Sequence, residues 1–141
     1  MGAIGSKVAD MGVMLGMNVI GFDPAITVEA AWKLPNKVER KESIEDVFKE
    51  SDYISLHVPA NDKTKGLINS DLLKNAKMGL RLINFARDEI VVSKDIIESL
   101  DKNILSKYIT DFADLDLISR AKIANDVIIC LLYTSPSPRD T

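Results

Sequence analysis

Two glycines and an aspartate near the start of the chain have the spacing of a dinucleotide-binding turn. Gly2-Ala3-Ile4-Gly5 matches the second half of the pattern G-x-G-x-x-G, whose first glycine would fall before Met1. Glycine lets the backbone approach a pyrophosphate there, and the helix that follows offers free N–H groups to the phosphates. Asp23 comes about 20 residues after Gly2, the spacing at which an acid meets the ribose hydroxyls. The pattern predicts a dinucleotide cofactor held by Gly2, Ala3, Ile4, Gly5 and Asp23.

The elements that must position these residues alternate between helices and strands. A helix is expected over residues 3–15, followed by an apolar strand over residues 17–22. Further strands are expected at 38–39, 52–58, 81–85, 106–112 and 126–129, and further helices at 28–32, 44–49, 69–75 and 93–100, with Ser43 and Ser93 as N-caps. Near-continuous apolar strands between amphipathic helices indicate a parallel sheet with helices on both faces, which is a doubly wound α/β fold.

Composition narrows the classes of function. A chain of 141 residues is long enough for one domain with a real core. The net charge of −3 gives no support for nucleic-acid binding or for an anionic membrane surface. The one cysteine excludes an internal disulfide and is typical of a reducing compartment, so a cytoplasmic protein is expected. We expect no membrane span and no metal site.

Three segments in the second half carry a more specific signal. Residues 52–59, followed by Thr64, combine an apolar strand with an H-x-P loop. Residues 82–87 end a strand in an arginine, and residues 108–112 end a strand in an aspartate. Together with the glycine turn, they resemble the D-isomer-specific 2-hydroxyacid dehydrogenases, and within that family the D-3-phosphoglycerate dehydrogenases. The resemblance runs from Gly2 to about Ile129, which is the family's NAD-binding domain without its first strand and without the substrate domain.

The resemblance implies roles at three positions. The residue that matches Arg87 grips the substrate carboxylate with its planar guanidinium fork, whereas the structural alternative is a surface arginine after a strand. Asp111 would accept a hydrogen bond from the nicotinamide carboxamide, or else cap a turn. Asp116 stands where the family places the glutamate that orients a catalytic histidine. Two departures are visible: Asp88 replaces a usual glycine, and the Glu-Pro sequence expected near Asp116 is absent.

The resemblance also implies further cofactor contacts. His57, Val58, Pro59 and Thr64 would line the adenosine side, with a purely structural turn as the alternative. Phe85 and Ala86 would line the cofactor through their backbone, or would simply pack in the strand. His57 is the one histidine of the chain, but the histidine of an H-x-P loop in this family is not the proton donor.

The end of the chain departs from the family. A catalytic histidine within P-H-x-G-A is expected just after residues 127–129, but the sequence continues from Cys130 into Leu131 and a Ser-Pro-Ser-Pro run. One back-translation of this run resembles the transposon adapter used in preparing sequencing libraries. We therefore expect residues 1–129 to be a fragment of an NAD-binding domain and residues 130–141 to be a non-native tail. The alternative is a genuine disordered tail.

These expectations combine into one functional hypothesis. The parent protein would be an NAD-dependent oxidoreductase that moves a hydride between nicotinamide and C2 of a small D-2-hydroxy acid. By resemblance its substrate would be 3-phosphoglycerate of serine biosynthesis, and it would be a homo-oligomer. A dinucleotide-sensing, corepressor-like module and the cofactor domain of an NAD-using hydrolase remain as alternatives. The fragment itself is expected to be inactive and poorly folded, because the absent first strand would lie between residues 17–22 and 52–58.

Overall fold

The computed structural model describes residues 3–23, 38–112 and 114–130. The helices are α1 (Ala3–Met14), α3 (Ile44–Glu50), α4 (Ser70–Leu73), α5 (Ser93–Asp101) and α6 (Leu115–Ile123), and a 3₁₀ turn covers Asp88–Ile90. The strands are β1 (Val19–Gly21), β2 (Val38–Arg40), β3 (Tyr53–Leu56), β4 (Leu80–Asn84), β5 (Leu105–Thr110) and β6 (Val127–Ile129).

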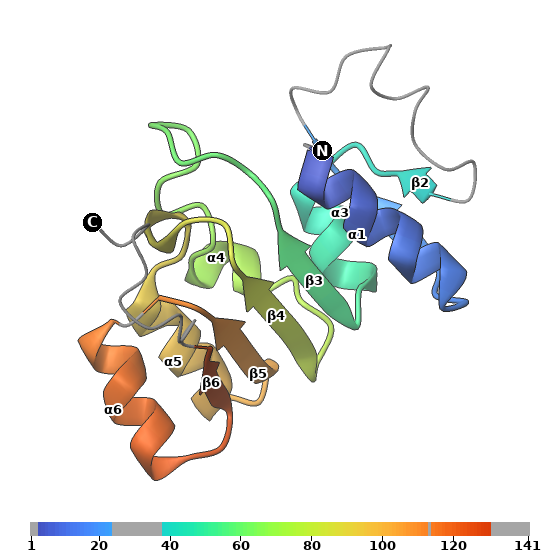
Figure 1. Cartoon of the computed structure of the whole chain (residues 1–141). Helices are drawn as coiled ribbons and strands as arrows, with labels where there is room; N and C mark the ends of the chain where they lie inside the picture. The colour runs from blue at the N-terminus through green and yellow to red at the C-terminus, as the bar shows by residue number, and fades with distance from the viewer. Residues whose placement is uncertain (1–2, 24–37, 113, 131–141) are drawn as a thin grey trace, which may run out of the picture.

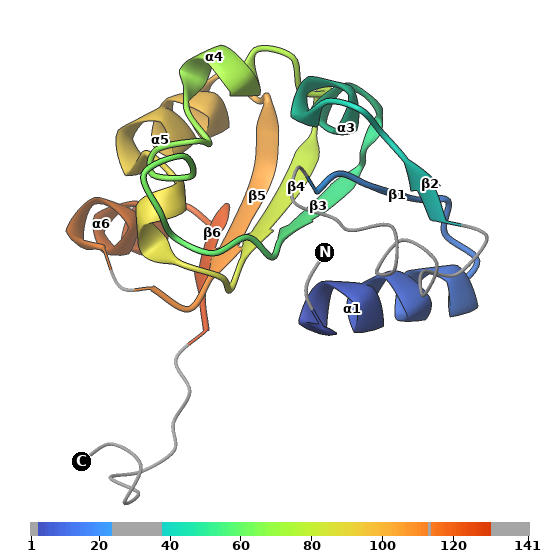
Figure 2. The ribbon, with the colours of Figure 1, turned by 90° about the horizontal axis from the view of Figure 1, so that it is seen from above.

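All strand pairs among the described residues are parallel. A four-stranded sheet has the order β3-β4-β5-β6, and β1 pairs separately with β2. Helices lie on both sides, since α1 covers β1 from one side while α3, α4, α5 and α6 lie on the other (Figures 1 and 2). The predicted doubly wound, Rossmann-like α/β class is confirmed.

The sheet is interrupted between β1 and β3. In the described part of the chain, β1 pairs only with β2, and β3 pairs only with β4. The interruption lies where the sequence predicts that the first strand is absent, because the doubly wound order places that strand between these two. Each of the two strands therefore keeps an edge without a ladder partner.

One face of the four-stranded sheet forms the core. Side chains alternate between faces along each strand, so Leu80, Leu82 and Asn84 of β4 are buried, while Arg81, between Leu80 and Leu82, is exposed. The pairing of Leu82 with Tyr108 and of Asn84 with Thr110 places four buried side chains together on the covered face. This register brings the carboxyl ends of β4 and β5 to the same level of the sheet.

Local sequence signals were read correctly at two helix starts and incorrectly at two others. Ser43 caps α3, because its Oγ accepts from the Asp46 N–H at 3.2 Å, and Asn69 caps α4 in the same way. Ser93 is the first residue of α5 and not its cap; Val92 holds that position and makes no side-chain cap bond. Helix α6 was not predicted, although Asp114 caps it by accepting from two backbone N–H groups. The helix expected over 28–32 lies outside the described residues.

Arg120 ties α6 to two neighbouring elements. Its guanidinium donates to Asp126, just before β6, at 2.8 and 3.1 Å, and to Asp101 at the end of α5 at 2.5 Å. The hydrogen bonds from Arg120 hold the pKa of Asp126 below its ordinary value of 3.8. Because Arg120 binds carboxylates that precede β6 and end α5, these hydrogen bonds fix the orientation of α6 against the sheet.

We expect Arg120→Gln to lower the free energy of unfolding at pH 7 by about 1 kcal/mol. Because the pKa of Asp126 is lower in the folded state, its contribution is present above about pH 4 and is lost as the pH falls through the lowered pKa. Urea unfolding at pH 7 and pH 3 should therefore show a smaller difference between variant and parent at pH 3. Lys102→Gln, which removes an exposed pair with Glu98, serves as the control; an equal loss at both pH values would contradict the role of Asp126.

Candidate cofactor site

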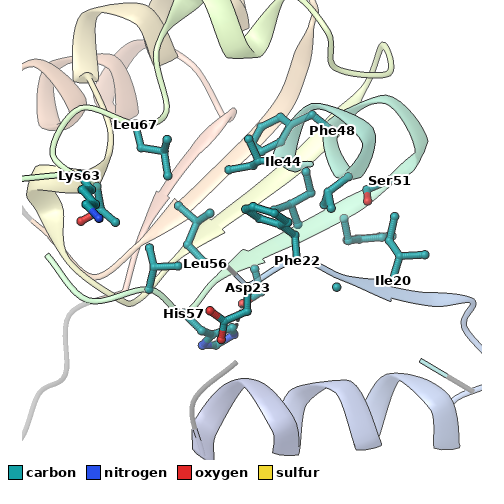
Figure 3. Close-up of a pocket in the computed structure, with 17 residues that line it drawn as sticks. Ile20, Phe22, Asp23, Ile44, Phe48, Ser51, Leu56, His57, Lys63 and Leu67 are labelled. Atoms are coloured by element: carbon teal, nitrogen blue, oxygen red, sulfur yellow. Dashed lines mark hydrogen bonds between the residues drawn. The ribbon is translucent and has the colours of Figure 1, made fainter. Parts of the chain in front are cut away.

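A cavity of about 260 Å³ lies between β1 and β3. Asp23 reaches it from just beyond β1, and the segment after β3 contributes a group of side chains to the same end of the cavity (Figure 3). These are His57, Val58, Lys63, Thr64 and Leu67. The structure thus brings together Asp23, His57, Val58 and Thr64, which are far apart in the sequence and were predicted to share one cofactor site.

The opposite part of the cavity has a different character. It is lined mainly by apolar side chains, including Ile20 of β1 and Ile44 and Phe48 of α3 (Figure 3). A surface of this kind suits a buried apolar element and offers little for a polar nucleotide to hydrogen-bond. We assign only the polar end, where the strands terminate, to the cofactor site.

Side-chain hydrogen bonds shape the turn after β3. The Thr64 hydroxyl donates to the Pro59 carbonyl at 2.6 Å, which holds Pro59 over the end of the turn. The Asn61 carboxamide oxygen accepts from the N–H groups of Lys63 and Thr64 at 2.8 and 3.0 Å. Asn61 was missed by the sequence analysis, although an Asn followed by Asp is a recognisable signal for a turn of this type.

His57 is held as a neutral side chain at this turn. Its Nε2 lies 2.8 Å from the Ser55 Oγ, and burial lowers the pKa of the imidazole below its ordinary value of 6.5. At pH 7 the ring therefore carries no charge to attract a phosphate. This geometry agrees with a lining role beside the adenosine and gives no reason to assign proton transfer to His57.

A second group of residues lies at the ends of β4 and β5. Phe85, Ala86 and Arg87 follow β4 directly, and Arg87 is exposed with its Nη1 donating to the Ala86 carbonyl at 3.2 Å. The Arg87 side chain is thus available to an incoming anion. Burial, followed by the nearby carboxylates of Asp114 and Glu89, raises the pKa of Asp88 next to it. The raised pKa reduces the charge that Asp88 places beside the arginine at mildly acid pH.

Asp111 follows β5 and presents an unusual oxygen atom. Its Oδ1 is buried and has no hydrogen-bond partner among the described residues. Such an atom is costly unless a donor from outside the chain satisfies it. An amide N–H₂ group, like that of a nicotinamide carboxamide, is a donor of the required kind, so the residues present fit the cofactor.

The remaining predicted site positions are less informative. Gly2 lies outside the described residues; α1 begins at Ala3, where Ile4 is exposed and Gly5 is buried. The amino end of α1 lies on the side of the sheet where β3 leads into its turn (Figures 1 and 2). Asp116 is exposed in the first turn of α6, and its backbone N–H donates to the Asp114 carboxylate at 2.8 Å. Its part in orienting a histidine stays a prediction.

Two features are absent from residues 3–23, 38–112 and 114–130. This part of the chain contains no group of three or more His, Cys, Asp or Glu side chains that could hold a metal ion. None of its helices is long and apolar enough to cross a membrane.

Comparison with known proteins decides the family. Residues 1–128 match the NAD-binding domain of the D-isomer-specific 2-hydroxyacid dehydrogenases. The chain belongs to this family. It is 37% identical over 101 residues to D-3-phosphoglycerate dehydrogenase from Bacillus subtilis, covering 72% of this chain and 19% of that protein. It is 34% identical over 105 residues to a D-lactate dehydrogenase from Staphylococcus epidermidis, covering 74% of this chain and 30% of that protein.

Solved structures of the family agree with the fold. The apo D-lactate dehydrogenase of Escherichia coli superposes with a TM-score of 0.80 at 26% identity, covering 92% of this chain and 40% of that one. The NAD complex of a D-2-hydroxyacid dehydrogenase from Lactobacillus delbrueckii gives 0.78 at 28% identity, covering 91% and 42%. The chain thus spans less than half the length of these relatives. The cofactor of this family domain is NAD.

Proposed function

We propose that this domain serves an enzyme that transfers a hydride between NAD and C2 of a D-2-hydroxy acid. The observation that carries the proposal is the placement of Arg87 and Asp111 at neighbouring strand ends. The Arg87 side chain is exposed, and Asp111 holds a buried oxygen that has no hydrogen-bond partner among the described residues. When bound, NAD supplies the hydride chemistry. Arg87 would bind the substrate carboxylate, and Asp111 would orient the nicotinamide.

For the substrate we propose 3-phosphoglycerate, which would place the parent enzyme in serine biosynthesis. The similarity to D-3-phosphoglycerate dehydrogenases supports it, while the similarity to D-lactate dehydrogenases makes D-lactate the competing substrate. Steady-state kinetics of the full-length enzyme with both hydroxy acids tests the choice. A higher kcat/KM for D-lactate would overturn 3-phosphoglycerate and leave the hydride-transfer proposal intact.

We also propose that the parent continues beyond Ile129 into the proline-histidine pair that supplies the proton-transfer group, with Asp116 orienting that histidine, and that residues 130–141 are a translated adapter. The family resemblance supports this continuation. A cytoplasmic homo-oligomer acting on a small molecule, without a nucleic-acid or membrane partner, fits the acidic composition and the single cysteine. Genomic sequencing past codon 129 tests the continuation; recovery of the same tail would contradict it.

Asp23 gives a direct test of cofactor choice. We expect the full-length enzyme to prefer NAD over NADP by about 100-fold in kcat/KM, because a 2′-phosphate beside a carboxylate costs several kcal/mol. Asp23→Ser should reduce this preference at least tenfold, mainly by weakening NAD. Asp62→Asn is the matched control, since it removes an exposed negative charge from the neighbouring turn outside the cavity lining. Equal kcat/KM for the two cofactors in the parent enzyme would contradict the assignment of Asp23.

A further inference from the structure

A buried polar group connects the two strand ends that carry Arg87 and Asp111. Asn84, the last residue of β4, is fully buried. Its Nδ2 donates to the Arg87 carbonyl at 2.9 Å and to the Tyr108 Oη at 3.2 Å, and its Oδ1 accepts from the Ala86 N–H at 3.1 Å. The Asn84 side chain therefore holds the backbone of both Ala86 and Arg87, through the Ala86 N–H and the Arg87 carbonyl.

β5 supplies the other half of this group. Tyr108 and Thr110 are fully buried on the same face of β5. The Thr110 hydroxyl donates to the Asn84 carbonyl at 2.9 Å and accepts from the Phe112 N–H at 3.2 Å. Thr110 thus connects β4 to the backbone of Phe112, the residue that follows Asp111.

We propose that Asn84, Tyr108 and Thr110 form a positioning unit that fixes the Arg87 turn and the Asp111 segment relative to each other. The proposal rests on the proposed function of Arg87 and Asp111 and adds residues that touch neither substrate nor cofactor. Asn84 holds the turn, Tyr108 fixes the orientation of the Asn84 amide, and Thr110 extends the connection to Asp111. All three act through the backbone of the residues that they hold.

A short exposed turn does not by itself fix the position of the Arg87 Cα. Arg87 has a long flexible side chain, so its guanidinium can grip a carboxylate in one pose only if its Cα is fixed. A fully buried and fully hydrogen-bonded amide does this well, because rotating it would leave the Arg87 carbonyl and the Ala86 N–H without their partners. The Tyr108 hydroxyl adds a third hydrogen bond, at 3.2 Å, that holds the Nδ2 end of the amide in place.

The test uses Tyr108→Phe in the full-length enzyme that carries this domain, with Ser106→Ala as the matched control. Ser106 lies on the same strand, and its hydroxyl donates to the Gly79 carbonyl at 2.9 Å, at the amino ends of β5 and β4 and therefore opposite to Arg87 and Asp111. We expect Tyr108→Phe to lower kcat/KM for the hydroxy acid about tenfold while the Kd for NAD changes less than about twofold. Amide hydrogen exchange in residues 84–88 should become faster. Ser106→Ala should change none of these quantities.

A double-mutant cycle separates positioning from a general loss of stability. In an Arg87→Lys background, Tyr108→Phe should have less than about a twofold further effect, because the fork that it positions is already gone. Full additivity, or an equal loss for the hydroxy acid and for NAD, would overturn the positioning role. If Tyr108→Phe unfolds, two Thr110 variants give the same test: Thr110→Ser keeps the hydroxyl and should retain parental kcat/KM, whereas Thr110→Val removes it and should lower kcat/KM about tenfold.

Failure of this proposal is distinguishable from failure of the proposed function. If Arg87→Lys leaves kcat/KM unchanged, the substrate role of Arg87 is wrong. If exchange in residues 84–88 is the same in Tyr108→Phe as in the parent, the positioning unit is wrong, whatever Arg87 does.

Discussion

Replacement of Arg87 by lysine in the full-length enzyme is expected to lower kcat/KM for the hydroxy acid by about 30- to 1000-fold, or about 2–4 kcal/mol. Lysine keeps the positive charge but cannot place two parallel N–H groups on one carboxylate. The affinity for NAD should change little, because the exposed guanidinium makes its one described hydrogen bond to the Ala86 carbonyl and holds no other element in place. Steady-state kinetics and calorimetric titration with NAD give the two quantities.

Arg81→Lys is the matched control for this substitution. Arg81 is an exposed arginine on β4, the strand that leads to Arg87, and its guanidinium carbon lies over the Tyr53 ring, 5.1 Å from the ring centroid. We expect at most a small effect on stability and none on kcat/KM. Equal losses in NAD affinity and in turnover for Arg87→Lys would mean that Arg87 is structural and that the carboxylate is bound elsewhere.

The second large effect concerns the interruption between β1 and β3. We expect that an N-terminal extension able to form a strand, six residues rich in valine and isoleucine followed by a glycine-containing turn, raises the Tm of the 141-residue chain by about 10 °C or more. It would pair with both free edges and cover the apolar lining of the cavity, including Ile20, Ile54 and Leu56. Thermal unfolding followed by circular dichroism measures the shift.

A matched extension with prolines at alternate positions separates strand pairing from added hydrophobicity. Proline lacks the N–H that a central strand must donate, so this extension should leave the Tm unchanged. A second check is Val8→Ser on α1, where Ile4, Val8, Met11 and Leu15 form an exposed apolar stripe. Val8→Ser should destabilise the extended chain more than the original one. Met14→Ser, at the last residue of α1 and off the face of Ile4, Val8 and Met11, should affect both chains equally. If both extensions give the same Tm, the gap does not accept a strand.

The elements that the sequence predicted well are those whose signals are local. The Ser43 and Asn69 side chains cap their helices within one turn, and the apolar runs of β3, β4 and β5 determine their own strand character. Helix α6 was missed because its first turn contains Asp116, which the sequence analysis considered only for a role in orienting a histidine; the Asp114 side chain caps this helix. Ser93 was assigned as a cap because it is a good capping residue, although the structure uses it one position inside the helix.

The sequence predicted which residues line the candidate site, but not the buried hydrogen bonds that hold the neighbouring strand ends in place. Asp23, His57 and Thr64 share a cavity because the carboxyl ends of different strands meet at one edge, which the fold class alone implies. The link between Asn84 and Tyr108 depends on the register of β4 against β5, including an irregularity between Leu80 and Arg81 that no sequence pattern marks. Long-range register is a property of packing, so it appears only in the structure.

The order of strands β3-β4-β5-β6 has a consequence for how the chain is made. Each strand pairs with the next one along the sequence, and β1 and β2 do the same. No ladder in the described residues has to wait for a segment synthesised much later, which keeps the entropy of loop closure low. As the polypeptide leaves the ribosome, each new strand therefore meets an edge already formed by its predecessor, and the sheet can grow from β3 toward β6 in the direction of translation.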